Sequence, residues 1–222
     1  VERYETEREI SHFMGAIVSM PAKSVPVGVS KFLIIDGQQR LTTIAILLCA
    51  LRDELPLEAK PQHNRIMNHY LVNDGYDGLE HLKLLPTQVD RVAFQTLVEN
   101  HSEVPPSRIR AAYEYFRKVI QGDETDLGKV DPIRLLETIE RRLMVVSINL
   151  SDSDDPYLIF ESLNFKGSRL EQADLVRNYF LMRFRLTEQQ RIYSEAWLPM
   201  QERLGAHLTE FIRHYLMKDG DE

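Results

Sequence analysis

The stretch KFLIIDGQQRLTTIAILLCALRDEL, residues 31–55, decides the fold predicted for this chain. Its first apolar run, 32–35, consists of β-preferring residues and stops at Asp36-Gly37, and an apolar helical pattern follows almost at once. The pattern predicts a buried strand, a tight turn and a buried helix that ends near Leu55. Glycine permits the sharp turn because it tolerates positive φ, and the first amides of the helix have no intrahelical acceptor.

Polar side chains at this turn suggest an anion site. Gln38, Gln39 and Arg40 lie between the strand and the helix, where free amides and a guanidinium attract phosphate. Asp36 is suited to a divalent cation or a hydroxyl. The alternative is structural: Asp36 is a turn or capping residue, Gln-Gln-Arg is a solvated helix start, and the Thr42 hydroxyl bonds to the backbone. Spacing alone favours the structural alternative.

Composition limits the class of protein. A chain of 222 residues with 43% hydrophobic residues predicts one large domain, or a core with a helical extension. The single cysteine, Cys49, lies in the apolar helix, so it indicates packing and a reducing cytosol rather than a disulfide framework or a zinc site. The longest apolar stretch, 44–51, is too short to span a bilayer, and the start has no signal peptide pattern, so a soluble cytoplasmic protein is expected. The net charge of −7 leaves room only for a local basic patch.

Hydrophobic spacing predicts mostly helices in the rest of the chain. Residues 1–20 have roughly helical spacing and begin in mid-pattern without Met, as a fragment would. Further helices are predicted at 64–71, from Thr87 with Val89, Val92, Ala93 and Leu97 on one face, at 108–121, from Pro132 to Arg142, from Pro156, from Leu170, and throughout 186–222. Strands are predicted at 81–85 and 143–150, the second beside the strand at 32–35 in a small sheet.

Other charged or ligand-type residues are interpreted as ordinary surface. The basic residues of the helix at 108–121 favour a solvated face, with a phosphate-contacting face as the alternative; they are Arg108, Arg110, Arg117 and Lys118. The acidic turn at 151–155 lacks the glycine and the terminal glutamate of a calcium loop. The histidine pairs, His63 with His69 and His207 with His214, are interpreted as packed or solvated residues.

Two motifs carry a resemblance to a known family. The first is Ile35-Asp36-Gly37-Gln38-Gln39-Arg40-Leu41-Thr42-Thr43, and the second runs from Phe160-Glu161-Ser162-Leu163-Asn164 through Gly167, Leu170, Asp174, Leu175, Arg177 and Asn178. With these motifs the sequence resembles the N-terminal domain family of GmrSD-type modification-dependent restriction endonucleases over nearly the whole chain.

The resemblance implies an α+β, predominantly helical fold. Its small β-sheet core is similar to the ParB/sulfiredoxin-like type, carries helical insertions over 1–185, and is followed by a helical extension over 186–222. Relatives also have a Tyr-Gln-Arg and Trp-containing segment upstream of the first helix. This chain begins after the place where that segment should be, so the N-terminal part of the family domain is expected to be missing.

The function implied by the resemblance is that of a nucleotide-binding, NTP-hydrolysing regulatory domain in a bacterial DNA restriction or anti-phage defence system. Mg²⁺ and a nucleoside triphosphate are the implied cofactors, and DNA, including modified DNA, and an HNH-type nuclease domain or subunit are the implied partners. No nuclease motif can be recognised in the sequence, and the identity of the nucleotide and a homo-oligomeric state are left open. The alternative is a non-catalytic DNA- or protein-binding module that uses the same DGQQR corner.

Residue roles follow from the resemblance and from the chemistry of phosphoryl transfer, which needs positioning and charge neutralisation. Asp36 is assigned to metal or ribose, amides from Gly37 onward and Arg40 to phosphate, and Gln38 or Gln39 to orienting water. The remaining nucleotide-binding residues are Thr42 and an opposite wall of Asn164, Asp174 and Arg177. If the helices after the two strands converge at the carboxyl edge of the sheet, Arg40 and at least one wall residue lie within roughly 10 Å in one pocket.

Overall fold

The structure is a computed structural model, and it describes residues 11–22, 28–100, 103–123, 128–151, 154, 173, 176–177, 180–181, 184, 188 and 191–218. The chain divides into two compact units, Val1–Asp152 and Ser153–Glu222, which are described separately below. The predicted boundary between residues 185 and 186 stays a prediction.

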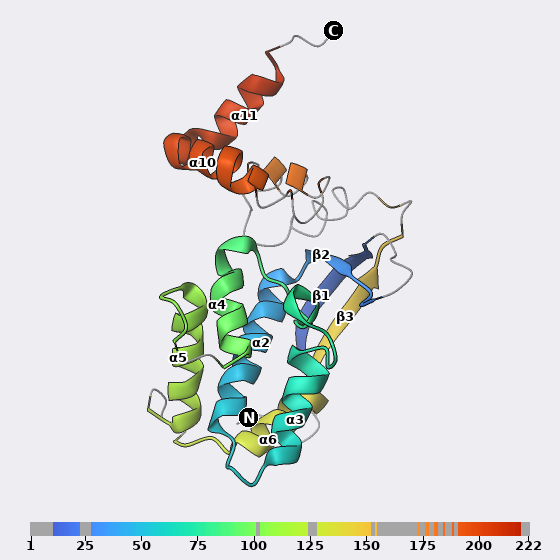
Figure 1. Ribbon diagram of the computed structural model, residues 1–222, viewed down its shortest axis with the longest axis vertical. Helices are drawn as coiled ribbons and strands as arrows, with labels where there is room; N and C mark the ends of the chain where they lie inside the picture. The colour runs from blue at the N-terminus through green and yellow to red at the C-terminus, as the bar shows by residue number, and fades with distance from the viewer. Residues whose placement is uncertain are drawn as a thin grey trace. The chain divides into compact units, whose positions relative to one another are not determined.

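The first unit is a small sheet with helices packed beside it (Figure 1). The α+β class and its helical predominance are therefore confirmed. In chain order the elements are β1 (His12–Pro21), β2 (Phe32–Asp36), α2 (Gln38–Glu54), α3 (Lys60–Arg65), a π-helical turn (Ile66–Leu71), a 3-10 turn (Gly78–Glu80), α4 (Gln88–Val98), α5 (Arg108–Gln121), α6 (Pro132–Arg142) and β3 (Leu143–Asn149).

The central strand of the sheet comes from the segment predicted to be a helix. The strand order is β2-β1-β3, and His12–Pro21 is β1, so the helical prediction for residues 1–20 is wrong there. Ile17 and Val18 are consecutive and both buried, which places buried side chains on both faces of the strand. A continuous apolar run of this kind cannot be distinguished from a buried helix by periodicity alone.

The two strands that the sequence suggested are not neighbours. β1 lies between them, pairing antiparallel with β2 (Val18 opposite Asp36) and parallel with β3 (Ser19 opposite Asn149). β2 and β3 therefore run in opposite directions, although their last residues, Asp36 and Asn149, lie opposite the consecutive β1 residues Val18 and Ser19. The helices predicted from Pro156 and Leu170 begin outside the described residues, so their convergence with α2 at one carboxyl edge stays a prediction.

The strand predicted at 81–85 is reduced to a single bridge. Only Leu82 pairs, with Val72, and the amide of Lys83 donates to the carbonyl oxygen of Leu71 at 3.0 Å. Leu84 and Leu85 instead pack against the helical core. The predicted helix at 64–71 is present as α3 and the π-helical turn, and it begins four residues earlier than predicted, at Lys60.

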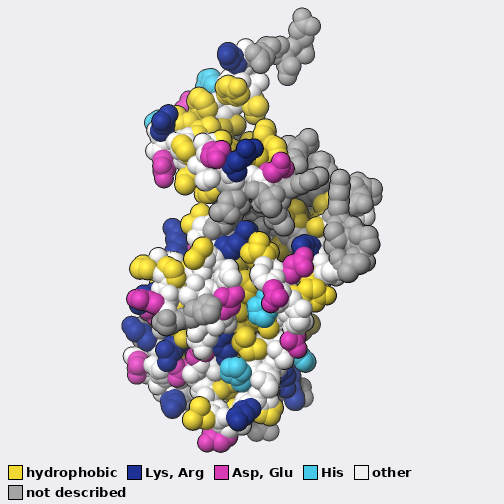
Figure 2. Space-filling view, in the orientation of Figure 1, with side chains coloured by type: hydrophobic (Ala, Val, Ile, Leu, Met, Phe, Trp, Pro, Cys, Tyr) yellow, Lys and Arg dark blue, Asp and Glu magenta, His cyan; other side chains and the backbone are white. Residues whose placement is uncertain are grey.

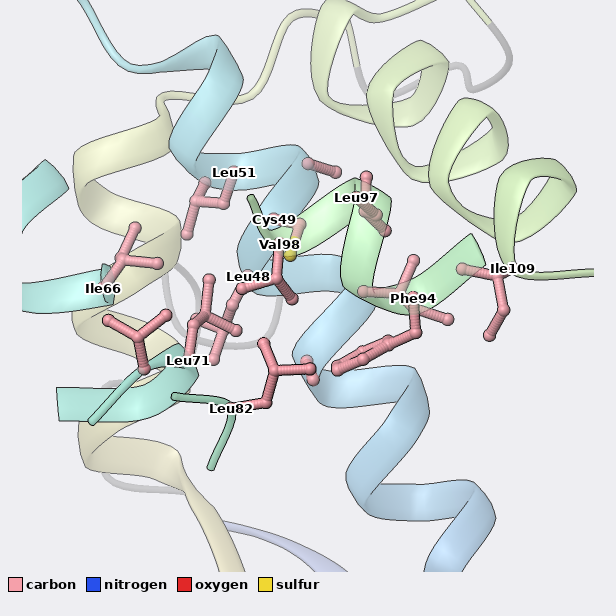
Figure 3. Close-up of a cluster of buried hydrophobic side chains, with 14 of the residues drawn as sticks. Leu48, Cys49, Leu51, Ile66, Leu71, Leu82, Phe94, Leu97, Val98 and Ile109 are labelled. Atoms are coloured by element: carbon pink, nitrogen blue, oxygen red, sulfur yellow. The ribbon is translucent and has the colours of Figure 1, made fainter. Parts of the chain in front are cut away.

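The core is centred on α2, whose side chains meet those of the π-helical turn, α4 and α5 (Figure 3). Cys49 is fully buried here, which confirms its packing role, and burial raises the pKa of its thiol to about 12. The face predicted for α4 is half right. Ala93 and Leu97 are buried, but Val89 and Val92 point to solvent and their places are taken by Phe94 and Val98.

The second unit is helical in its described C-terminal part. It contains a π-helical turn (Tyr193–Trp197), α10 (Leu198–Leu204), a 3-10 turn (Gly205–His207) and α11 (Leu208–Leu216). The prediction of helix throughout is interrupted at Gly205, which has φ 49°. His207 and His214 are exposed on either side of Glu210, in agreement with solvated histidines. Among the described residues, no helix is long and apolar enough to cross a membrane.

Candidate functional site

The predicted strand, turn and helix at residues 32–54 are present. β2 ends at Asp36, Gly37 takes the left-handed conformation with φ 93°, and α2 begins at Gln38. Gly37 accepts the first helical hydrogen bond, from the amide of Leu41 at 3.0 Å. The N-cap residue, Gly37, has no side chain with which to cap α2, and no acidic residue lies in the first turn of the helix. The positive end of the helix dipole and the first amides are thus available to an anion.

Asp36 and Arg40 form an ion pair across this turn. Nη2 of Arg40 lies 2.6 Å from Oδ2 of Asp36, and the two side chains are 33% and 24% exposed. Nε of Arg40 is buried and has no hydrogen-bond partner within the part of the chain that the structure describes. The pair holds a positive and a negative group at the start of α2, each neutralised by the other.

The two glutamines differ in their surroundings. Gln38 donates from Nε2 to the carbonyl oxygen of Ile34 at 2.7 Å, which ties it to β2. The side chain of Gln39 is exposed and makes no hydrogen bond to any described residue. Thr42 donates from Oγ1 to the carbonyl oxygen of Gln38 at 2.9 Å, so the hydroxyl bonds to the backbone as the structural interpretation expected.

β1 forms the floor beneath the turn, and sequence reasoning missed it. A Cβ atom added to Gly37 would lie 2.5 Å from Cδ1 of Ile17 and 3.1 Å from the carbonyl oxygen of Ala16. A Cβ added to Gly15 would lie 2.8 Å from Nη1 of Arg40. The signal for Gly15 was a glycine inside an apolar run, which in a strand marks a bulge or a close approach. This signal did not lead to a strand prediction, because the helical spacing of residues 1–20 predicted a helix.

The residues predicted for the opposite wall of the site are not among the described residues of the first unit. Asn164 and Asp174 lie outside the described residues, and Arg177 belongs to the second unit, which is described by itself. The single pocket stays a prediction, although the strand adjacency from which it was argued is wrong. Within the described ranges, no group of three or more His, Cys, Asp or Glu residues could hold a metal ion.

The basic face of α5 is largely paired with acids. Arg110 binds Glu114 at 2.7 Å, and Arg117 binds Glu54 on α2 at 2.6 Å. On the face shown in Figure 2, positive and negative side chains are interspersed over the first unit. These contacts favour the ordinary solvated face over a phosphate-contacting one.

Comparison with known families agrees with the motifs. The sequence model of a family described as the GmrSD restriction endonuclease, N-terminal domain, matches residues 4–181. The match therefore includes the whole turn from Asp36 to Arg40 and the strand β1 beneath it. No curated protein matches the chain at a significant level.

Proposed function

Because the chain belongs to the family of GmrSD restriction endonuclease N-terminal domains, we propose that its Asp36–Arg40 corner binds a nucleoside triphosphate and hydrolyses it with Mg²⁺. Membership in the family implies a role in a restriction system. The observation that carries the proposal is the Asp36 to Arg40 ion pair at the uncapped start of α2.

Phosphate binding is supported by three kinds of donor in one place. The first-turn amides of α2 lack helical acceptors, the helix dipole favours negative charge, and the guanidinium of Arg40 can bind phosphate through two parallel hydrogen bonds. An incoming phosphate would take the place of Asp36 beside Arg40.

Asp36 fits a magnesium ion that arrives with the nucleotide. Mg²⁺ keeps several of its waters and is held by one or two carboxylates together with substrate phosphates, so a dedicated cluster of acids is not required. When phosphate takes the place of Asp36 beside Arg40, the Asp36 carboxylate loses its cation, and the metal would replace it. Of the two glutamines, Gln39 is the better choice for orienting the attacking water, since Gln38 is already tied to Ile34. Gly37, Thr42, Asn164, Asp174 and Arg177 complete the proposed nucleotide site.

The proposed setting is a bacterial defence system in the cytoplasm. Hydrolysis would regulate an HNH-type nuclease domain or subunit that cuts foreign DNA, including modified DNA. The small sheet of the first unit is proposed to be of the ParB/sulfiredoxin-like type, in which a corner of this kind handles nucleotide.

A second candidate is a non-catalytic module that binds DNA or a protein through the same corner. It is favoured by the Thr42 contact, which uses the hydroxyl within the helix rather than toward a ligand. This module would bind phosphate groups of DNA, or acidic side chains of a protein, without releasing phosphate from NTPs.

Phosphate release and thermal stability together test the proposal. The wild-type chain, Arg40→Ala and Arg110→Ala are incubated with ATP or GTP and Mg²⁺, with and without DNA, and melted under the same conditions. Nucleotide at about 100 times its Kd should stabilise the wild type by about 2.7 kcal/mol. Arg40→Ala should lose this shift and the phosphate release, while Arg110→Ala keeps both because Arg110 lies on α5, outside the proposed corner, and pairs with Glu114.

The outcomes separate the two candidates. Stabilisation by DNA without any phosphate release would support the non-catalytic module. An unchanged nucleotide shift in a folded Arg40→Ala variant would contradict a phosphate role for this corner.

A further inference from the structure

We infer that Gly15 is a positioning residue for Arg40, because only a residue without a side chain lets the guanidinium lie against the β1 backbone. The inference rests on the proposed function for what the guanidinium binds. It adds a residue on β1, outside the DGQQR motif, that determines where the phosphate-binding group is held.

The contact is close along much of the Arg40 side chain. A Cβ on Gly15 would lie 2.8 Å from Nη1, 3.3 Å from Cζ and 3.7 Å from Cδ of Arg40. The shortest of these distances is to the nitrogen that neighbours Nη2, the donor to Asp36. A side chain at position 15 would therefore displace the group that makes the ion pair, rather than a remote part of the arginine.

The backbone at Gly15 is shaped for this approach. Its φ is +107°, which side-chain-bearing residues rarely adopt, and the pairing between β1 and β3 shifts register between Phe13 and Gly15. Such a bulge bends a strand locally and re-aims its neighbours. The long side chain of Arg40 leaves the first turn of α2 and is thus held at two points. Nη2 donates to Asp36, and Nη1 lies against the bulge at Gly15.

The competing explanation is that glycine is needed at position 15 for its φ angle alone. The chain offers a matched control for that explanation in Gly28, which has φ +121° and no atom within 4 Å of an added Cβ. Alanine at either position strains the backbone, but only alanine at position 15 meets Arg40. A difference in nucleotide binding between the two variants therefore measures the effect of the contact with Arg40.

The binding experiment uses the whole chain and titrates ATP and GTP with Mg²⁺ into wild type, Gly15→Ala and Gly28→Ala, each below its melting temperature. Loss of a charge-assisted contact should weaken binding by about tenfold or more in Gly15→Ala, while Gly28→Ala stays within about twofold. Equal effects in the two variants would overturn the inference.

A double-mutant cycle tests whether Gly15 acts through Arg40. Lysine keeps the charge but lacks both Nη atoms, so Arg40→Lys should weaken nucleotide binding strongly in the wild type and little further in Gly15→Ala. Independent, additive losses would overturn the inference. If Gly15→Ala does not fold, recovery of folding in Gly15→Ala/Arg40→Lys supports the contact, and failure of the double variant to fold overturns it.

A nucleotide-free measurement separates this inference from the proposed function. The ¹⁵N resonance of Nε in Arg40, assigned by its loss in Arg40→Lys, should shift in Gly15→Ala and not in Gly28→Ala. An unmoved resonance would overturn the inference. If the wild type binds no nucleotide, the proposed function fails, and the resonance still decides the role of Gly15.

Discussion

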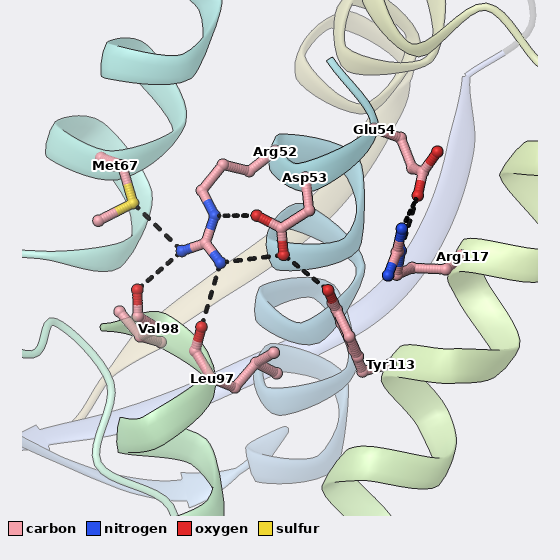
Figure 4. Close-up of polar contacts among 8 residues, drawn as sticks. All are labelled: Arg52, Asp53, Glu54, Met67, Leu97, Val98, Tyr113 and Arg117. Carbon is pink, nitrogen blue, oxygen red and sulfur yellow. Dashed lines mark hydrogen bonds and ion pairs between the residues drawn. The ribbon is translucent and has the colours of Figure 1, made fainter. Parts of the chain in front are cut away.

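Arg52 and Val98 are joined by a buried hydrogen bond, from Nη1 of the guanidinium to the carbonyl oxygen of Val98 at 2.7 Å (Figure 4). Nη2 also donates to the carbonyl oxygen of Leu97 at 3.1 Å, so a side chain of α2 satisfies the last carbonyls of α4. Arg52 is 3% exposed, and its charge is balanced by Asp53 at 2.7 Å. Tyr113 on α5 donates to the same carboxylate at 2.7 Å. One buried charge thus ties three helices together.

Replacing Arg52 by methionine should destabilise the first unit by about 3 kcal/mol, since breaking one side of a buried ion pair leaves Asp53 without its cation and two helix carbonyls without their donor. Urea unfolding of wild type and Arg52→Met measures the difference. The control is Arg110→Met, at an exposed ion pair on α5, which should stay within about 0.5 kcal/mol of wild type. Equal midpoints for Arg52→Met and wild type would show that the buried network contributes nothing.

Stability should fall at alkaline pH because the buried Cys49 and the partly buried Tyr113 keep their protons in the folded state. Burial raises the pKa of Cys49 from 9.0 to about 12. Burial, with the hydrogen bond to Asp53, raises the pKa of Tyr113 from 10.0 to about 12. The unfolded chain releases these protons first, so their contribution is complete below pH 9 and is lost as pH rises toward 12.

The part due to Cys49 can be isolated between pH 9 and 10 by comparing wild type with Cys49→Ala, because Tyr113 contributes to both proteins. There the thiol should give a slope approaching about 1.4 kcal/mol per pH unit. Urea midpoints of wild type and Cys49→Ala at pH 8, 9, 9.5 and 10 measure it, and the slope in this interval should be smaller in the variant. The same slope in both proteins would contradict a protonated, buried thiol.

Gly37→Ala should destabilise the protein by about 2 kcal/mol, because it combines backbone strain with overlap onto β1. The matched control is Gly75→Ala, at φ +81° with open space around the added Cβ, where strain alone should cost about 1 kcal/mol. Thermal or urea unfolding of the two variants gives the comparison. If Gly75→Ala proved equally destabilising, the close packing of the turn on Ile17 would have no energetic weight.

The edge strand β3 should promote self-association of this chain. Met144, Val145 and Val146 are 54%, 46% and 50% exposed, and the segment 143–149 contains no charged residue or proline to protect the edge. A second copy of β3 is a suitable partner for this edge, because apolar side chains lie on both faces of the strand in each copy. Sedimentation over a range of concentrations should show association that Val145→Lys abolishes.

A suitable control for the edge is Val89→Lys, which removes an exposed valine from α4. Association that persists in Val145→Lys but disappears in Val89→Lys would move the contact from the sheet to the helix.

The local elements were predictable where one periodicity dominated. The turn at Asp36-Gly37 and α2 follow from residues 31–55 because the apolar run, the glycine and the helical pattern are adjacent and need no distant partner. The helix boundaries at Arg108 and Pro132 follow from local caps, since Ser107 and Asp131 accept hydrogen bonds from the first-turn amides. These interactions span only a few residues, so the sequence contains them in full.

The tertiary structure alone decided which elements meet. His12–Pro21 is a strand because β2 and β3 supply hydrogen-bond partners on both its edges, and pairing over more than 120 residues leaves no local pattern. The role of Gly15 depends on the same pairing. Its partner, Arg40, lies 25 positions later in the sequence and reaches Gly15 only because β1 passes beneath the turn. The sequence motif identified the charged residues of the candidate site. The tertiary structure placed Asp36 and Arg40 in contact with each other, with Arg40 against Gly15 of β1.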